Sequence, residues 1–377
     1  MRGRETIFIY SLLLIEMASK SHISLFIFLF LFNICSLSPS TAQTVPAFYV
    51  FGDSLADVGN NNHLKLSLAK ADFPHNGIDF PGSKATGRFS NGKNAADFLA
   101  EKLGLTTPPP YLSISTVNNR SNAFLGGVNF ASGGAGILDG SAVQSLSLNK
   151  QIEYYSVVYG DLVQMIGTVE SQKHLSRSIF GIVIGSNDIL GYFKAGSSKR
   201  SNYTPQQFVD LLILTLRGQV KRIYNLGARK VVFVGAGAIG CCPSQRKQNK
   251  TESCNEETNY WSDKYNEGVK TVLEGIKSEL KDMSYSFFNT YAVLLDFIQK
   301  PAAYGFTEVK AACCGLGNLN AKVACLPIAT YCPNRRNHVF WDFYHPTEAA
   351  ARKFVDTAFS GSKPYVYPIN VQQLVAI

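Results

Sequence analysis

The segment Val45-Pro-Ala-Phe-Tyr-Val-Phe-Gly-Asp-Ser-Leu55 carries the clearest structural signal in this chain. Its first seven residues are almost all apolar, as is typical of a strand that is buried on both faces of a sheet. Gly52 interrupts the run, and the polar residues 57–63 follow, so the pattern predicts a strand, a tight turn, and then a loop or helix start. Ser54 is therefore expected at the carboxyl end of a strand, where open α/β sheets place their ligands.

Similar apolar runs recur along the chain and alternate with amphipathic segments. The predicted strands are 47–51, 127–131, 179–184, 230–234 and 285–288. The predicted helices are 94–103, 151–169, 204–225, 255–282 and 346–359, and Thr204-Pro205 is a cap followed by a first-turn proline. Alternating strands and helices predict a five-stranded parallel sheet that is covered by helices on both faces. The length of 377 residues allows two or three domains, but no linker is visible, so a single domain over 43–377 is predicted.

The N-terminal segment predicts secretion. Lys20 and His22 precede the apolar run Ser24 to Leu37, and small residues follow it, which indicates a signal peptide 1–42 that is cleaved after Ala42. The alternative is a transmembrane anchor, because the uncharged run approaches the length of a short span. A second methionine, Met17, begins a signal peptide of ordinary length, so residues 1–16 can be an upstream extension.

A secreted protein is often glycosylated and disulfide-bonded, and the remaining sequence contains candidate sites for both modifications. Asn119, Asn202 and Asn249 each begin an Asn-x-Ser/Thr sequon and are predicted glycosylation sites. The seven cysteines after the signal fall in two loop-like stretches and are predicted to form disulfides. An odd number leaves at least one cysteine unpaired, and Cys242, beside Cys241, is the candidate. Neither stretch has the paired spacing of a zinc site.

The formal net charge of +9 has two interpretations. Scattered basic residues can simply keep the protein soluble, or they can hold it electrostatically on an acidic polymer or membrane surface. No basic run is interleaved with aromatic residues, so a nucleic-acid partner is not expected.

Four polar sites are expected at strand ends, three of them directly after predicted strands and the fourth, 341–346, near the C-terminus, and they supply the parts needed for acyl transfer. Ser54 can be the nucleophile, and His345 can be its base, because histidine titrates near neutral pH. Asp342 lies three residues before His345 and can orient the imidazole. The N–H of Ser54, a glycine N–H from the loop 129–136 and the amide of Asn187 can form an oxyanion hole.

Each of these sites also has a simpler interpretation. A serine in such a turn is usually a cap, and the glycine-rich loop could cradle a phosphate, although it lacks the phosphate-binding motifs. Asn187-Asp188 could be a turn pair, and Asp342 with His345 could be a surface pair or half of a metal site. The Gly-x-Ser-x-Gly elbow of α/β-hydrolases is absent.

Taken together, the sites resemble the GDSL esterase/lipase family of SGNH-type serine hydrolases, in particular its secreted plant branch. The resemblance spans about residues 47–359 and includes four ordered blocks, with Gly87–Gly92 and Ala312–Gly315 as further plant features. The blocks are Phe51-Gly-Asp-Ser-Leu55 with Asp57-Val-Gly-Asn-Asn-Asn62, Gly127–Gly136, Gly185–Asp188 and Val339–Pro346. It implies a flavodoxin-like three-layer fold, a catalytic Ser54, Asp342 and His345, and an oxyanion hole of Ser54, Asn187 and Gly134, with Gly133 as the alternative glycine. The doubled Cys241-Cys242 departs from the family pattern and leaves the disulfide pairing open.

The expected function is that of a secreted, monomeric serine esterase or lipase that forms an acyl-enzyme and needs neither cofactor nor metal. Its ester substrate would be a lipid or an acylated cell-wall compound, and the protein could also contact an acidic wall polymer. The alternatives are an extracellular acyltransferase, a non-catalytic wall- or lipid-binding glycoprotein, and a phosphate-binding module. The sequence does not distinguish acetylated sugars, wall polyesters, phospholipids and triglycerides as substrates.

Overall fold

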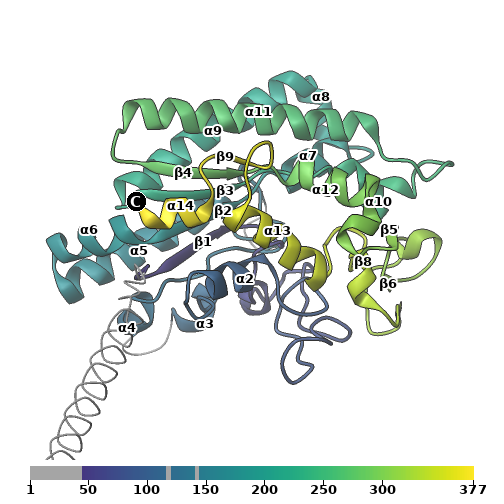
Figure 1. The fold of residues 1–377 in the computed structure, drawn as a ribbon, viewed down its shortest axis with the longest axis horizontal. Coiled ribbons are helices and arrows are strands. Elements are labelled where there is room, and N and C mark those ends of the chain that lie inside the picture. The colour runs from purple at the N-terminus through teal and green to yellow at the C-terminus, as the bar shows by residue number, and fades with distance from the viewer. Residues whose placement is uncertain (1–44, 116–119, 141–143) are drawn as a thin grey trace, which may run out of the picture. The chain divides into compact units, whose positions relative to one another are not determined.

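The structure is a computed structural model that describes residues 45–115, 120–140 and 144–377. The predicted signal peptide 1–42 and the sequon at Asn119 lie outside these residues. Residues Val45–Ile377 form one compact unit, which is drawn in Figure 1.

The central sheet has five strands in the order β1-β2-β3-β4-β9. The first four are parallel and match predicted strands: β1 (Phe48–Gly52), β2 (Ile179–Val183), β3 (Lys230–Val234) and β4 (Ser284–Phe288). The fifth, β9 (Val366–Pro368), pairs antiparallel with β4 at the edge. The predicted fold class is thus confirmed, since the sheet is mostly parallel and flanked by helices, but the prediction that all five strands are parallel is wrong.

The predicted strand 127–131 is not a strand of this sheet. It does run beside β1, because Val50 N–H donates to Val128 O at 2.9 Å and Phe130 N–H donates to Val50 O at 2.7 Å. Its pairing with β1 is limited to one parallel bridge, and on its other side Asn129 bridges to Pro110. The segment therefore lies where a further parallel strand would be and bonds to β1 from Gly126 to Ser132, but it forms isolated bridges and no continuous ladder.

Alternate residues of the parallel strands face opposite layers. In β1, Tyr49 and Phe51 belong to one hydrophobic cluster and Phe48 and Val50 to the other, and all four are buried. Figure 1 shows the helices of the two layers on either side of the sheet. Helices that pack into the first cluster are α5 (Leu148–Ile166), α6 (Thr168–Arg177), α7 (Ser186–Phe193), α9 (Pro205–Asn225), α11 (Glu256–Glu279) and α12 (Thr290–Gln299). The second cluster includes residues of α2 (Ala95–Lys102) and α14 (Val371–Ala376), and α13 (Glu348–Ser360) contributes to both clusters.

The long helices begin at residues that can cap them. Thr204 and Gln207 form a capping box at the start of α9, and Asn255 caps α11. The predicted helix 151–169 is divided, because Gly167 adopts φ 78° between α5 and α6. Nothing in the prediction corresponded to α12. No helix within the described residues is long and apolar enough to cross a membrane.

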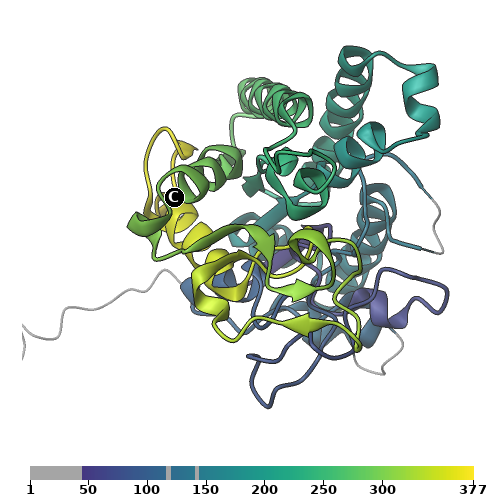
Figure 2. The ribbon, with the colours of Figure 1, turned by 90° about the vertical axis from the view of Figure 1, so that its right-hand side faces the viewer.

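Two small sheets and several short helices form the connections. Strand β5 (Glu308–Ala312) pairs parallel with β8 (His338–Phe340), and β6 (Cys314–Gly315) pairs antiparallel with β7 (Thr330–Tyr331); Figure 2 shows them facing the viewer. The short helical segments are η1 (Asn60–His63), α3 (Tyr111–Ile114), α4 (Arg120–Phe124), α8 (Ser198–Asn202), η2 (Ile239–Cys241), α10 (Pro243–Arg246), η3 (Pro301–Tyr304), η4 (Asn318–Asn320) and η5 (Arg335–Asn337).

Candidate active site

Ser54 is held in a sharp turn directly after β1. Gly52 there has φ 149°, and a Cβ on it would lie 2.2 Å from Val183 O, so only glycine fits against β2. The buried Gln151 side chain bonds both the N–H and the carbonyl of Gly52 at 2.8 Å. Asp53 Oδ1 accepts the N–H of Leu55 at 3.0 Å and so braces the turn.

Asp342 and His345 lie in a second tight turn, which follows β8. Trp341 N–H donates to His345 O at 2.7 Å and closes this turn. Asp342 Oδ1 accepts the backbone N–H groups of Tyr344 and His345, each at 2.8 Å. The pair was expected to follow a strand, and it does, but that strand belongs to the small β5–β8 sheet and not to the central one.

The two turns bring the three predicted side chains into one hydrogen-bonded chain. His345 Nε2 lies 2.7 Å from Ser54 Oγ, and His345 Nδ1 lies 2.8 Å from Asp342 Oδ2. Ser54 and His345 are half-buried, whereas Asp342 is buried. With Nδ1–H donating to the carboxylate, Nε2 is free to accept the serine proton. The arrangement is that of a hydroxyl nucleophile, a base, and a group that orients the base.

The electrostatics keep the Asp342 carboxylate ionised. Burial by itself would raise its pKa, but the neighbouring His345 and the N–H groups of Tyr344 and His345 lower the pKa below the ordinary value. Asp53 behaves differently: burial raises its pKa to about 7, and its Oδ2 has no hydrogen-bond partner among the described residues. Asp342, and not Asp53, is therefore the carboxylate suited to stabilise a charged imidazole.

The three residues predicted to donate to the oxyanion, Ser54, Gly134 and Asn187, line the same cavity as His345. Within the described residues, the N–H groups of Ser54 and Gly134 have no acceptor, whereas Gly133 N–H donates to Asp57 Oδ2 at 3.0 Å. The exposed Gly134, which has φ 83°, is thus better placed as a donor than Gly133. Asn187, at the start of α7 after β2, uses one amide N–H for Ala135 O at 3.0 Å and retains a second.

A network of buried polar side chains, to which the sequence interpretation gave no role, positions the glycine loop. Asp57 accepts N–H groups from the chain that follows it and from Gly133, while burial raises its pKa to about 6. Asn60 Nδ2 donates to the carbonyls of Asn129 and Ala131, at 2.8 and 2.9 Å. Asp188 accepts the N–H groups of residues 137 and 138 and so braces the end of this loop. The asparagine-rich motif after Ser54 was the signal that could have revealed this network.

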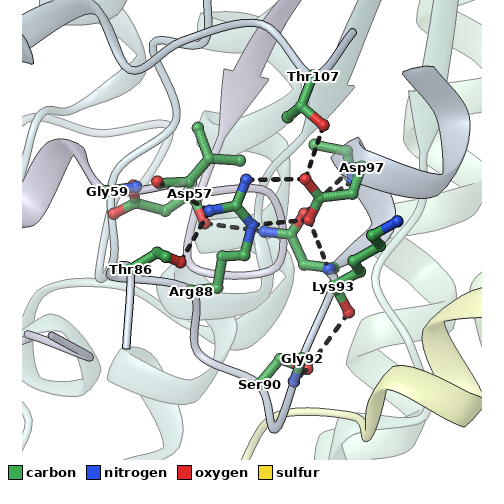
Figure 3. Close-up of polar contacts among 12 residues, drawn as sticks. Asp57, Gly59, Thr86, Arg88, Ser90, Gly92, Lys93, Asp97 and Thr107 are labelled. Carbon is green, nitrogen blue, oxygen red and sulfur yellow. Dashed lines mark hydrogen bonds and ion pairs between the residues drawn. The ribbon is translucent and has the colours of Figure 1, made fainter. Parts of the chain in front are cut away.

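A buried ion pair anchors the segment that packs on the histidine. Figure 3 shows Arg88 and Asp97, joined by two hydrogen bonds of 2.7 Å, with Arg88 also bonded to Thr86 Oγ1. The next residue, Phe89, places its ring 4.9 Å from the His345 ring. A Cβ on Gly133 would lie 2.6 Å from the same phenyl ring. The Arg88–Asp97 pair thus holds Phe89 between the histidine and the glycine loop.

A cavity of about 400 Å³ opens at these residues. Ser54, Asn187 and His345 line it together with mostly apolar side chains, which include Phe89, Leu190 and Leu294. It also reaches residues of the second cluster, such as Leu99 and Val355. Tyr344 lines this cavity, whereas Trp341 is buried and donates to Asn76 Oδ1 at 3.0 Å.

The cysteines form three disulfides and leave one thiol free within the described residues. The pairs are Cys241–Cys254, Cys313–Cys332 and Cys314–Cys325. Cys242 is the free one, which confirms the prediction. It is buried and lines the cavity, and burial, reinforced by Asp342, raises the pKa of its thiol to about 12. Asn202 and Asn249 are exposed, and their glycosylation stays a prediction.

Comparisons with known proteins identify the family. Residues 48–357 match the family described as GDSL-like Lipase/Acylhydrolase. Two GDSL esterase/lipases of Arabidopsis thaliana are 46% and 43% identical to the chain, over 88% and 83% of it and 90% and 88% of their own lengths.

Among solved structures, the chain resembles LAE5, an alpha/beta hydrolase from the metagenome of Lake Arreo, with 12% identity and a TM-score of 0.39 over 82% of this chain and 91% of that one. It also resembles a catalytic mutant of Axe2, an acetylxylan esterase from Geobacillus stearothermophilus, with 14% identity and a TM-score of 0.35 over 82% and 90%. Because both TM-scores are low, the assignment rests on the sequence comparisons. The chain belongs to the GDSL-like lipase/acylhydrolase family and is a carboxylic ester hydrolase.

Proposed function

We propose that this protein is a secreted serine esterase/lipase that cleaves carboxylic esters through an acyl-enzyme at Ser54. The observation that carries the proposal is the hydrogen-bonded chain from Ser54 Oγ through His345 to Asp342, with distances of 2.7 and 2.8 Å. A serine hydroxyl is a weak nucleophile until a base accepts its proton, and this geometry supplies that base.

In the proposed reaction, Ser54 Oγ attacks the ester carbonyl as His345 Nε2 takes its proton. Asp342 stabilises the imidazolium that results. The N–H groups of Ser54 and Gly134 and the Asn187 amide donate to the oxyanion. His345 then protonates the leaving alcohol, and the acyl group stays on Ser54. Water attacks the acyl-enzyme with His345 again as base, and the carboxylic acid is released.

The apolar lining of the cavity favours substrates that carry a lipid-like acyl or alcohol group. Leu190, Leu294 and Phe89 offer no hydrogen bonds, so they suit hydrocarbon better than a sugar ring. Action on lipid or acylated cell-wall esters outside the cell, by a monomer without a metal or cofactor, is part of the same proposal. It is supported by the N-terminal signal pattern and by the three disulfides.

The test is ester hydrolysis by wild type and by Ser54→Ala, on short- and long-chain p-nitrophenyl esters. We expect the substitution to lower kcat by at least about 10⁴-fold, because the remaining groups cannot form an acyl-enzyme. EDTA should leave the wild-type rate unchanged. Ser156→Ala is the control, since that serine is exposed on α5 and its hydroxyl donates to the local carbonyl Glu153 O. Full activity of Ser54→Ala would refute the proposal.

A further inference from the structure

Exposed apolar side chains gather on the segments that border the mouth of the cavity. Leu68, Leu326 and Tyr344 line the cavity and are 90%, 39% and 38% exposed. Leu66 and Ile328, on the same segments, are 66% and 76% exposed. Single exposed apolar residues are ordinary, but several around one opening indicate an interaction surface. We propose that this rim, defined as Leu66, Leu68, Leu326, Ile328 and Tyr344, docks the enzyme on the surface of a lipid aggregate with anionic headgroups.

The first rim segment is held so that its leucines point outward. Ser67 is buried between Leu66 and Leu68, and its hydroxyl donates to Gln144 O at 2.7 Å. The Gln144 side chain in turn bonds the carbonyl of Leu66 and the N–H of Leu68, both at 3.0 Å. Asn61 Nδ2 holds the carbonyl of residue 69 at 2.7 Å. The exposure of the two leucines therefore belongs to an anchored turn.

The second rim segment is fixed by covalent bonds. The disulfides Cys313–Cys332 and Cys314–Cys325 enclose it. Cys325 and Ala329 are buried, and the residues between them, Leu326 to Ile328, are exposed. Ala329 N–H donates to Leu326 O at 2.8 Å and closes the turn. Two independent scaffolds thus present leucine and isoleucine to solvent beside the same cavity.

The charge on these segments favours an anionic surface. Residues 60–72 and 313–332 contain Lys65, Lys70 and Lys322 against a single acidic residue, Asp72. Lys65 and Lys322 are exposed. Lysines beside apolar side chains are the combination that binds anionic lipid surfaces, where the hydrocarbon enters the headgroup layer and the ammonium groups stay at the phosphates. An acidic polysaccharide would use the lysines but would leave the leucines in water.

Docking in this way would bring the mouth of the cavity against the substrate phase, so an ester could pass from the aggregate to Ser54 without crossing water. The benefit of docking rests on the proposed function, because docking would deliver an ester to Ser54. The docking itself requires no hydrolysis. Binding can therefore be measured on the Ser54→Ala protein, and a failure of docking is then distinguishable from a failure of the proposed chemistry.

The experiment is co-sedimentation of full-length mature Ser54→Ala protein with vesicles of phosphatidylcholine containing phosphatidylglycerol. We expect Leu66→Ser/Ile328→Ser in this background to lower the partition coefficient by at least about tenfold, because two apolar side chains no longer enter the lipid. With Ser54 intact, the same pair of substitutions should leave hydrolysis of a soluble acetate ester unchanged and lower the rate on mixed vesicles. Neither residue lines the cavity.

The matched control is Val169→Ser/Leu214→Ser, which removes side chains that are 78% and 72% exposed on α6 and α9. It should bind vesicles as the parent does. The inference would be overturned if the Ser54→Ala parent did not bind vesicles, or if the control lost as much binding as Leu66→Ser/Ile328→Ser. It would also be overturned if the parent bound polygalacturonate more tightly than vesicles. Gel filtration gives a fourth test: a parent that self-associates through Leu66 and Ile328, and sediments for that reason, would contradict docking.

Discussion

Two buried carboxyls near the nucleophile differ in how their oxygens are satisfied. Asp342 accepts three N–H donors, and its pKa is lowered despite burial. Asp53 has one donor on Oδ1 and none on Oδ2, and burial raises its pKa to about 7. The two carboxyls are the same residue type, but their hydrogen bonds differ. The hydrogen bonds keep Asp342 ionised, whereas Asp53 binds a proton readily.

The Asp53 carboxyl makes stability depend on pH. Its pKa rises from 3.8 to about 7 on folding, so between these values the folded state holds a proton that the unfolded state has lost. Stability therefore falls as pH rises through this window. Asp53→Asn cannot ionise and lacks this loss. We therefore expect the Tm of Asp53→Asn minus the Tm of wild type, measured by thermal unfolding, to be larger at pH 8 than at pH 5. An equal difference at the two pH values would contradict the raised pKa of Asp53.

Asn187 tests the oxyanion site. Asn187→Ala should lower kcat about 10²–10³-fold with little change in KM, because the amide donates most strongly to the developing oxyanion. Asn187→Asp is the matched variant, since it keeps the size of the side chain but has no N–H. If kinetics show that the aspartate variant retains full kcat, donation by Asn187 is not needed.

At the scale of elements, apolar runs and capping residues were enough to locate most of the fold. The four parallel strands and α9, which begins with Thr204-Pro205, appear close to where they were predicted. The edge strand β9 has only three residues, which is too short for a periodic signal. The segment predicted as a strand over 127–131 does lie beside β1 and bonds to it, but it forms only isolated bridges, with Val50 and with Pro110. How far such a segment pairs with its neighbours depends on tertiary contacts that periodicity does not contain.

The segment that leads into α2 depends on the Arg88–Asp97 ion pair. Both residues are buried, so Arg88→Ala would leave the Asp97 carboxylate without its main partner. We expect chemical denaturation to show a loss of about 3–5 kcal/mol in unfolding free energy. Lys102→Ala removes the partner of Asp356 in an exposed pair of 2.7 Å and should cost no more than about 1 kcal/mol. Similar losses in both variants would show that the buried pair does not anchor this segment.

At the scale of the molecule, the site joins Ser54 and His345, which are 291 positions apart in the sequence. Ser54 follows a strand of the central sheet, whereas His345 follows a strand of the small β5–β8 sheet. The residues of the site could be predicted from strand ends and motif resemblance. The network of Asp57, Asn60 and Gln151 that places them could not, because it consists of side chains bonded to distant backbone groups. Disulfide pairing was equally open, since spacing alone does not determine it.

The cysteine arrangement predicts a definite thiol count. A chain that begins at Gln43 should show no thiol reactive toward Ellman's reagent when native, because Cys242 is buried and its thiol pKa is raised to about 12. After unfolding without reductant, it should show one. Three or more thiols in the unfolded, unreduced chain would contradict the three disulfides.

A covalent probe can show whether Ser54 is the nucleophile that His345 activates. The protein is treated with a fluorophosphonate, a reagent that phosphonylates activated serines, and the adduct is mapped by peptide mass spectrometry. We expect one adduct, on the peptide that contains Ser54, with none in Ser54→Ala and a greatly slowed reaction in His345→Ala. Loss of esterase activity with the adduct on another residue, and Ser54 unmodified, would contradict this role of Ser54.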